Sequence, residues 1–578
     1  MKRPGRRLCL TGLSGTGKTA VGRSVARLLG ADFEDLDETI ASREGRSVAN
    51  LFAEGEARFR RAEREALAGW LSRTGGEENG AVLALGAGSL TDAGSARDLA
   101  ESTTLVWLDA DSGVLAARIG VGRSSHRPLI EEASDVPARL ERMRAERVDG
   151  YRCAAMKIDT EAAARAALTA TGAPLDAPLR AAAALLRCLY EPSFAGEADA
   201  GAGWEDPVRP LAPVEEIPLA RGVTVRRGGH ARRETARIAM ILDAGLPEIH
   251  ARAIRERLDG PSCIVGVPGG ERTKSWSQLA DTWDRLARAG VDRDWTIVAA
   301  GGGAVTDLAG MAAHTFKRGV ALELHPTTLL AQADAALGGK SGVNVSHLKN
   351  VAGAIDVPRG IHIDTLHLTT LPVEAYRGGL AEVVKCGVIA DVALVDHLER
   401  DGALLLEGQL PALERAVVAA ARIKLSICGR DLHERGERRL LNLGHTLGHA
   451  LESATSGRAR PLTHGEAVSI GMVAAARLAR RCGVLRDESL PERLEGLLAG
   501  LGLAVRAELS NDRERDLLWR AIGNDKKRAR GRAVWVLPVR AGEAVLHEPA
   551  ADEIRVVIEE VVRFVGDGDH EVGRSERA

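Results

Sequence analysis

One eight-residue segment near the start of the chain limits the possible fold more than any other feature. Residues 12–19 read GLSGTGKT, a GxxxxGK[ST] pattern, directly after an apolar run and directly before a helical pattern. Glycines in such a loop let backbone N–H groups surround phosphates, the lysine reaches the β and γ oxygens, and the final hydroxyl can hold Mg²⁺. The segment therefore predicts a strand, a phosphate loop and a helix, as in a parallel α/β domain. The candidate nucleotide-binding residues are Gly12, Ser14, Gly15, Thr16, Gly17, Lys18 and Thr19.

The length of the chain, 578 residues, requires more than one hydrophobic core. Strand and helix patterns alternate up to about residue 159, and an alanine-rich helical stretch follows at 161–189. Residues 191–213 have the Gly, Ala, Pro and acidic composition of a linker. Alternation then resumes up to about residue 375, after which long amphipathic helices dominate and strand character returns only near RAVWVLPV. We expect an α/β fold in four parts: a P-loop domain with a parallel sheet at 1–190, the linker at 191–213, a nucleotide-binding α/β domain at 214–375, and a helical metal- and substrate-binding domain at 376–578.

Charge and cysteine usage exclude several classes of protein. The 78 basic and 80 acidic residues give a formal net charge of −2, so nucleic acid or a membrane surface has no global electrostatic attraction to this chain. No apolar run approaches the length of a membrane-spanning helix. The seven cysteines are far apart, with no CxxC pair, which is typical of reduced thiols and disfavours cysteine ligation of a metal. We expect a cytoplasmic protein with small-molecule substrates.

The segment LLNLGHTLGHALESATSGRARPLTHGEA, residues 440–467, carries three histidines and predicts half of a metal site. His445 and His449 are four residues apart and share one face of a helix, and His464 can return from a second helix after a Gly/Pro-containing break. Glu382, on the apolar helical run GGLAEVVKCG, can supply the carboxylate that a Zn²⁺ site needs. A surface pair between Glu382 and Lys385 is the alternative. Spacing alone favours His445 and His449 as the histidine ligands.

Other motifs point to phosphate and hydroxyl groups. Asp35 and Asp37 are expected to end a short strand and point to one side, where one can serve a metal and the other a substrate hydroxyl; a solvated acidic loop is the alternative. GGGAVTDLAG follows a strand and opens a helix as pyrophosphate-binding turns do, although it is not a literal GxGxxG. The glycine-rich segment after it collects Lys340, Lys349 and Asn350, which suggests contact with an anion.

The order of motifs over residues 7–160 resembles the shikimate kinases. The matching features are the P-loop, the DxD of Asp35 and Asp37, FRxxE, a glycine-rich loop, an RP lid and RxxxY. The resemblance implies that Thr19 and Asp35 hold Mg²⁺, that Lys18, Asp37 and Arg127 are catalytic, and that Arg118 packs against adenine. The remaining implied shikimate contacts are Arg60, Gly86, Gly88 and Arg147, with Asp37. One departure is Ala87, where the family has a third glycine. Another small-molecule P-loop kinase is the alternative.

Residues from about 215 to 565 resemble the 3-dehydroquinate synthases. The matching runs include GGERTKS, GGGAVTDLAG, PTTLLAQADAALGGKSGVN, GLAEVVKCG, RLLNLGHTLGHALE, HGEAV and DKK. The resemblance implies NAD- and metal-dependent conversion of 3-deoxy-arabino-heptulosonate 7-phosphate to 3-dehydroquinate and phosphate, with Glu382, His445 and His464 as ligands of Zn²⁺ or Co²⁺. His449 then becomes a substrate or proton-transfer residue. A different sugar phosphate cyclase, such as a deoxyinosose or valiolone synthase, and a metal-dependent polyol dehydrogenase are the alternatives.

The same resemblance assigns the remaining contacts. The implied NAD contacts are Asp243, Glu271, Lys274, Gly302, Gly303, Asp307, Thr327, Thr328, Leu330, Lys340 and Lys349. The implied substrate contacts are Arg318, Asp334, Lys340, Asn350, Lys385, Lys424, Arg438, Asn442, His449 and Lys526, of which Lys385, Lys424, Arg438, Asn442 and His449 are catalytic candidates. Gly245 stands where the family has an asparagine, so one polar nucleotide contact is missing. A homodimer through the C-terminal enzyme is expected. The two reactions are not consecutive, so equal dosage explains the fusion more simply than direct transfer of a product.

Overall fold

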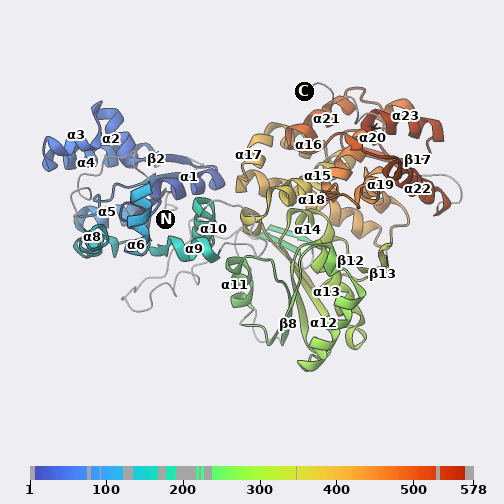
Figure 1. Cartoon of the computed structure of the whole chain (residues 1–578), viewed down its shortest axis with the longest axis horizontal. Helices are drawn as coiled ribbons and strands as arrows, with labels where there is room; N and C mark the ends of the chain where they lie inside the picture. Colours follow the sequence, from blue (N-terminus) through green and yellow to red (C-terminus); the bar gives the residue numbers. More distant parts are fainter. Residues whose placement is uncertain are drawn as a thin grey trace, which may run out of the picture.

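A computed structural model of the chain describes residues 7–74, 80–91, 93–121, 135–166, 177–190, 217–220, 223–226, 237–258, 260–346, 348–528 and 534–565. The chain forms an N-terminal α/β part and a larger C-terminal part, which Figure 1 shows side by side with helix α10 between them. Within the described residues, no helix is long and apolar enough to cross a membrane.

The N-terminal part is built on a parallel five-stranded sheet in the order β2-β3-β1-β4-β5. Its central strands β1 and β4 are buried almost throughout, which explains their apolar sequences. The strands are β1 (Arg7–Thr11), β2 (Asp32–Asp35), β3 (Ala81–Ala84), β4 (Thr104–Asp109) and β5 (Met156–Asp159). The helices are α1 (Lys18–Leu29), α2 (Leu36–Glu44), α3 (Val48–Ala53), α4 (Glu56–Arg73), α5 (Ala93–Ser102), α6 (Ser112–Val121), α8 (Val136–Tyr151), α9 (Thr160–Ala166) and α10 (Ala177–Tyr190).

A second sheet of seven strands follows, in the order β6-β7-β14-β11-β10-β8-β9. All neighbours are parallel except the edge pair β6 and β7. The strands are β6 (Ile217–Ala220), β7 (Val223–Arg226), β8 (Ile238–Asp243), β9 (Cys263–Val267), β10 (Thr296–Gly301), β11 (Ala321–Pro326) and β14 (Gly360–Asp364). The connecting helices are α11 (Glu248–Arg257), η3 (Glu271–Thr273), α12 (Trp276–Arg288), α13 (Gly303–Thr315), η4 (Phe316–Arg318), α14 (Leu329–Ala333), η5 (Ala335–Leu337) and η6 (Thr365–Thr370).

The last part is mainly helical, as the sequence predicts. Its helices are α15 (Val373–Ala390), α16 (Val392–Arg400), α17 (Gly402–Leu406), α18 (Leu410–Arg430), η7 (Glu437–Asn442), α19 (His445–Thr455), α20 (His464–Arg481), α21 (Leu490–Gly500), α22 (Asp512–Arg528) and α23 (Ala551–Val561). Its apolar core is continuous with that of the second sheet, so these two parts share one hydrophobic cluster. The predicted boundary at 375/376 falls inside α15.

Several strands have no counterpart in the sequence prediction. An antiparallel hairpin forms from β12 (Lys340–Val345) and β13 (Leu348–Ile355), within the segment that was expected only to contact an anion. In the helical part, β16 (Trp535–Arg540) matches the predicted strand, but its partner β17 (Glu543–His547) and the pair β15 (Ala507–Leu509) and β18 (Val562–Phe564) were not expected. These pairs are short, and their residues alternate too few times to give a clear period.

Candidate active sites

The phosphate loop has the predicted position between β1 and α1. Gly12 has φ 143° and Gly17 has φ 88°, a range that side chains rarely adopt, and a Cβ atom on Gly12 would lie 2.1 Å from the carbonyl oxygen of Leu108. The Nζ atom of Lys18 donates to the carbonyl oxygens of Gly12 (2.9 Å) and Leu13 (3.1 Å). The lysine therefore folds over its own loop, at the N-terminus of α1, where phosphate groups are favoured.

Asp35 and Asp37 occupy different elements, which corrects the expectation that both end one strand. Asp35 is the last residue of β2 and the N-cap of α2, and Asp37 lies in the first turn of that helix. One oxygen of Asp35 accepts from the amides of Asp37 (3.0 Å) and Glu38 (3.3 Å), and the other accepts from the Thr19 hydroxyl at 2.6 Å. Thr19 and Asp35 are therefore close enough to act on one Mg²⁺ ion.

Asp37 faces the loop that contains Gly86, Ala87 and Gly88. A Cβ atom on Gly86 would lie 2.8 Å from Oδ1 of Asp37. Burial raises the pKa of Asp37 to about 6; Lys18 opposes this shift, and the charges of Asp35 and Glu63 add to it. A carboxylate with a pKa of about 6 can hold and release a proton near neutral pH, as a general base must.

Two arginines bind the backbone of the same loop. The guanidinium of Arg60 donates to the carbonyl oxygen of Gly88 (3.0 Å) and to Glu63 (2.7 Å), and that of Arg147 donates to the carbonyl oxygen of Ala87 at 2.8 Å. A Cβ atom on Gly88 would lie 2.6 Å from Arg60. Ala87 does not have a positive φ, so the alanine fits where the family has glycine. Asp37, Arg60 and Arg147 thus lie around the same glycine loop.

Of the two arginines expected near the nucleotide, Arg118 and Arg127, only Arg118 lies within the described residues. Arg118 on α6 donates to the carbonyl oxygen of Gly15 and to the Thr160 hydroxyl, both at 3.3 Å, so it lies beside the phosphate loop. Arg127, the expected lid arginine, lies outside the described residues.

The second site forms where α15, α19 and α20 meet. Gly378 on α15 and Gly465 on α20 allow these helices to touch, because a Cβ atom on Gly465 would lie 2.2 Å from the Cα atom of Gly378. Glu382 lies one turn after Gly378, and His464 directly precedes Gly465. The helix contact therefore brings a carboxylate and an imidazole together from positions far apart in the sequence.

Glu382, His445 and His464 form a candidate metal centre. Oε1 of Glu382 lies 3.2 Å from Nε2 of His464 and 3.7 Å from Nε2 of His445, and one ligand atom from each residue lies within 4.8 Å of the others. His449 is exposed and is not part of this group; it belongs to a second candidate group with Glu452 and His464. The pairing of His445 with His449 that spacing favours is therefore not the one that surrounds Glu382.

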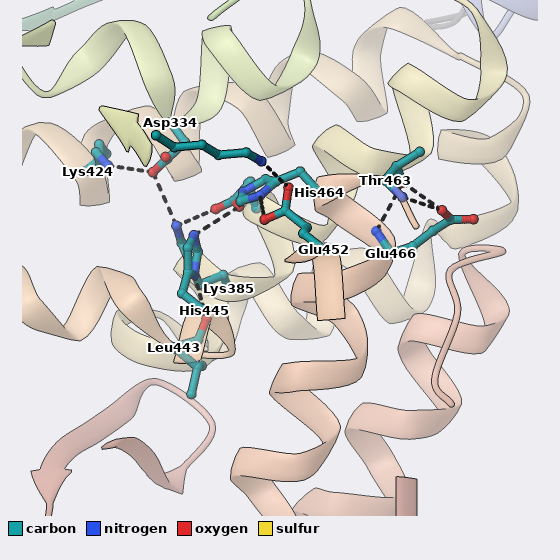
Figure 2. Close-up of polar contacts among 11 residues, drawn as sticks. Asp334, Lys385, Lys424, Leu443, His445, Glu452, Thr463, His464 and Glu466 are labelled. Carbon is teal, nitrogen blue, oxygen red and sulfur yellow. Dashed lines mark hydrogen bonds and ion pairs between the residues drawn. The ribbon is translucent and has the colours of Figure 1, made fainter. Parts of the chain in front are cut away.

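In both histidines nearest Glu382, the Nδ1 atom of the ring has a polar partner. Nδ1 of His445 lies 3.1 Å from the carbonyl oxygen of Leu443, and Nδ1 of His464 lies 3.4 Å from Oε2 of Glu452 (Figure 2). A partner at Nδ1 leaves Nε2 free to coordinate, as is usual for metal-bound histidines. Burial lowers the pKa of His445 to about 3, so that it is neutral. Burial also disfavours charge on His464, but Glu382 and Glu452 raise its pKa to about 10, so a positive charge is favoured between the two carboxylates.

A buried cluster of charges adjoins the candidate metal centre. Oδ1 of Asp334 lies 2.6 Å from Nζ of Lys424 and 3.3 Å from Nζ of Lys385 (Figure 2), and Lys385 also pairs with Glu382. Burial opposes the ionisation of Asp334, but the two lysines lower its pKa to about 2. Burial alone would lower the pKa of Lys385, yet Asp334 and Glu382 raise it above its ordinary value. Lys385 is therefore cationic, and the alternative of an exposed Glu382–Lys385 pair is wrong because both side chains are buried.

A cavity of 530 Å³ connects these groups and gathers most of the expected substrate contacts. Its lining includes Asp307, Asp334, Lys340, Asn350, Lys385, Lys424, Glu434, Arg438, Asn442 and His445. Glu434 was not expected: it pairs with Lys340 and accepts from the Asn442 side chain at 2.9 Å, in a left-handed conformation with φ 56°. Glu452 was not expected either, although its position three residues after His449 places it on the same helix face.

Several of the expected nucleotide contacts lie around the N-terminus of α13. Gly302 is its N-cap, and a Cβ atom there would lie 3.0 Å from the Thr328 side chain; a Cβ atom on Gly303 would lie 3.0 Å from Ala335. Such a backbone surface without side chains can approach a pyrophosphate closely. Near it, Lys274 pairs with Asp307 at 2.6 Å. Asp243 ends β8, and its carboxylate accepts from the amide of Gly245 at 2.8 Å.

Three expected substrate contacts are not placed in the cavity, and one of them is His449, which is exposed and absent from its lining. Arg318 is exposed on η4, with φ 65°, and does not line the cavity within this chain. Lys526 lies on α22, but its side chain is outside the described residues. Lys349 is exposed on the β12–β13 hairpin and pairs with Glu452 at 3.0 Å, so it bridges the hairpin to α19.

Comparisons with known families divide the chain as the structure does. Residues 14–172 match the profile of shikimate kinase, residues 264–378 that of the N-terminal part of 3-dehydroquinate synthase, and residues 379–528 that of its C-terminal part. The 3-dehydroquinate synthase of Symbiobacterium thermophilum is 39% identical to this chain over 354 residues, which are 60% of this chain and 98% of that protein.

Two solved structures are also similar to the C-terminal part. The 2-epi-5-epi-valiolone synthase ValA from Streptomyces hygroscopicus subsp. jinggangensis 5008, with NAD⁺ and Zn²⁺ bound, has a TM-score of 0.53 and 28% identity, covering 61% of this chain and 98% of that one. A 2-deoxy-scyllo-inosose synthase complexed with carbaglucose-6-phosphate, NAD⁺ and Co²⁺ has a TM-score of 0.53 and 28% identity, covering 60% of this chain and 100% of that one.

Proposed function

The chain belongs to the 3-dehydroquinate synthase family and carries a shikimate kinase domain in front of the synthase, and from this premise we propose how its two sites work. Both resemblances seen in the sequence are confirmed, so another P-loop kinase and a polyol dehydrogenase lose their support. The proposal covers the roles of individual residues, the substrates, and the use of Mg²⁺ with ATP, NAD and a divalent metal by this chain.

In the kinase domain, Asp37 accepts the proton of the shikimate hydroxyl that attacks the γ-phosphate. Its raised pKa of about 6 supports this role, because the group is ionised at neutral pH and still basic enough to take the proton. Arg60 and Arg147 meet at the Gly86–Gly88 loop and bind the substrate carboxylate. Lys18 turns from its loop carbonyls to the phosphates, and Thr19 with Asp35 holds Mg²⁺.

In the synthase, the donor set of one carboxylate and two imidazoles fits a catalytic Zn²⁺ site with open positions. When bound, the metal would acidify a substrate hydroxyl and NAD⁺ would accept and return a hydride. Glu382, His445 and His464 would hold the metal, and the glycine surface at Gly302 and Gly303 would hold the pyrophosphate.

The residues of this chain bind and orient the heptulosonate phosphate around that centre. Lys385 and Lys424 line the cavity and pair with Asp334, and they face the phosphate or the carboxylate of the substrate. His449 is exposed, yet desolvation by the residues packed around it lowers the pKa of its imidazole, so the ring is neutral at pH 7 and can accept a proton beside His464.

The observation that carries the proposal is the convergence of Glu382, His445 and His464 beside the Asp334–Lys385–Lys424 cluster. A dehydrogenase of simple polyols has no need of buried lysines for a phosphate. The test is a crossover experiment with wild type, His445→Ala and Lys18→Met. Phosphate release from the heptulosonate phosphate with NAD⁺ should be lost only in His445→Ala, and ATP-dependent phosphorylation of shikimate only in Lys18→Met.

One of the two similar cyclases suggests a control substrate. It is complexed with carbaglucose-6-phosphate, so glucose 6-phosphate should be offered to this chain in the same phosphate-release assay. Turnover of the heptulosonate phosphate alone supports the proposal. Faster release from glucose 6-phosphate, or loss of both activities in either variant, contradicts it.

A further inference from the structure

Helix α10 lies between the two enzymes and packs against both (Figure 1). Ala181, Ala182, Leu185 and Leu186 of this helix belong to the apolar core of the kinase sheet, together with residues of β1 and α1. The same cluster includes Leu366 of η6 and Leu410 of α18, which belong to the synthase. The core of the kinase therefore continues into the synthase without a layer of solvent-exposed side chains between them.

A polar network crosses the same junction inside this apolar surrounding. The guanidinium of Arg187, near the end of α10, donates to Oδ2 of Asp364 and, at 2.8 Å, to Nδ1 of His250. Because a guanidinium only donates, His250 accepts at Nδ1 and carries its hydrogen on Nε2, which lies 2.9 Å from the Thr370 hydroxyl. Arg187 and Asp364 have exposed fractions of 0% and 1%. The network thus connects α10 with the end of β14, η6 and α11.

The buried charges of Arg187 and Asp364 each depend on the other. A buried ion pair that loses one member leaves an uncompensated charge in an apolar surrounding. Burial opposes the ionisation of Asp364, and the Arg187 guanidinium is the largest of the influences that hold its pKa well below the ordinary value, ahead of those of His367 and Arg257. Burial lowers the pKa of His250, so that this residue adds no positive charge. Within the part of the chain that the structure describes, the main counter-charge of this synthase carboxylate comes from α10.

We infer that residues 177–190 are a docking element shared by both enzymes, in which Arg187 pairs with Asp364 and fixes the kinase against the synthase. The partner of this synthase surface is α10 of the same chain, presented together with α1. The C-terminal end of α1 also packs closely against the synthase. A Cβ atom on Gly30 would lie 2.9 Å from the Gln409 side chain, just before α18. The inference rests on this interface and not on the reactions proposed above.

The test uses the full chain and the variant Arg187→Met, which keeps the length of the side chain but removes its charge. We expect small-angle X-ray scattering to give a larger maximum dimension than for wild type, because the two enzymes separate. We also expect the thermal transition of the synthase to fall by about 5 to 15 °C. Arg288→Met is the matched control, since Arg288 forms an exposed pair with Asp284 at 2.6 Å on α12 and should change neither quantity.

Two further variants keep the inference falsifiable. The double variant Arg187→Met/Asp364→Asn should lose less stability than the sum of the two single variants, because no buried charge is left alone. If Arg187→Met does not fold, Leu366→Ala removes an apolar contact of α10 without stranding a charge and should still enlarge the scattering dimension. Wild-type scattering from the folded variants, or strict additivity of the two single changes, would overturn the inference.

Discussion

The carboxylate of Glu452 lies 3.4 Å from Nδ1 of His464, on the side of the imidazole ring opposite Glu382. The other oxygen of Glu452 pairs with Lys349 at 3.0 Å, which ties the nucleotide-side hairpin to the helix that carries His445 (Figure 2 shows Glu452 beside His464). Glu452 therefore acts through His464 by holding the ring and its tautomer.

We therefore predict that Glu452→Gln weakens metal binding by about 10- to 100-fold. The measurement is competition with a chromogenic chelator, which reports affinity independently of turnover. Glu466→Gln is the control, because Glu466 lies on the same helix as His464 but completes the capping box with Thr463. An unchanged affinity in Glu452→Gln would show that the contact does not orient the ligand.

The glycine loop of the kinase provides a steric prediction. A Cβ atom on Gly88 would lie 2.6 Å from a guanidinium nitrogen of Arg60, so Gly88→Ala should displace this arginine from its place. We expect the KM for shikimate to rise by about tenfold or more, with a smaller change in the KM for ATP. Ala87→Gly should behave like wild type, because Ala87 has no positive φ to relieve. Equal kinetics for Gly88→Ala and Ala87→Gly would mean that Arg60 does not bind the substrate.

Local patterns in the sequence predicted part of the fold and part of the candidate sites. The strand, phosphate loop and α1 follow from local pattern, and so does the α/β alternation, because the spacing of apolar residues and glycines is local information. The contact of α15 with α20 depends on Gly378 meeting Gly465, which no spacing reveals. Glu434 and Arg187 were missed because their partners, Lys340 and Asp364, are remote in sequence. The placement of Glu382 with His445 and His464 was expected only from family resemblance.

Replacing Asp37 should stabilise the kinase domain and lower its activity. Burial raises its pKa from 3.8 to about 6, so between about pH 4 and 6 the unfolded chain releases a proton that the folded kinase retains. Stability therefore falls as the pH rises through this window, and the cost remains at higher pH. Asp37→Asn removes the cost and should raise the free energy of unfolding of the kinase by about 1 to 3 kcal/mol at pH 8.

The same substitution removes the proposed base, so the rate of shikimate phosphorylation should fall by about 100-fold or more. In wild type the rate should rise with pH through about 6 and then level off. Thermal unfolding at pH 5 and pH 8, together with initial rates over the same range, measures both effects. A variant that is less stable than wild type at pH 8, or a wild-type rate that does not change near pH 6, contradicts this account of Asp37.

The roles of the two histidines on α19 can be separated by measuring metal content as well as turnover. His445 directs Nε2 toward Glu382 at 3.7 Å, whereas His449 is exposed at the edge of the helix and lies outside that group. We expect His445→Ala to lose most of its bound Zn²⁺ after dialysis. His449→Ala should keep the metal and lose about 100-fold in phosphate release, because only a proton acceptor is removed. If both variants lose the same amount of metal, His445 and His449 are the histidine ligands, as helix spacing favours. If His449→Ala keeps full activity, His449 has no catalytic role. The two measurements together decide between these roles, because loss of a direct ligand removes the metal, whereas loss of a catalytic group lowers the rate at full metal occupancy.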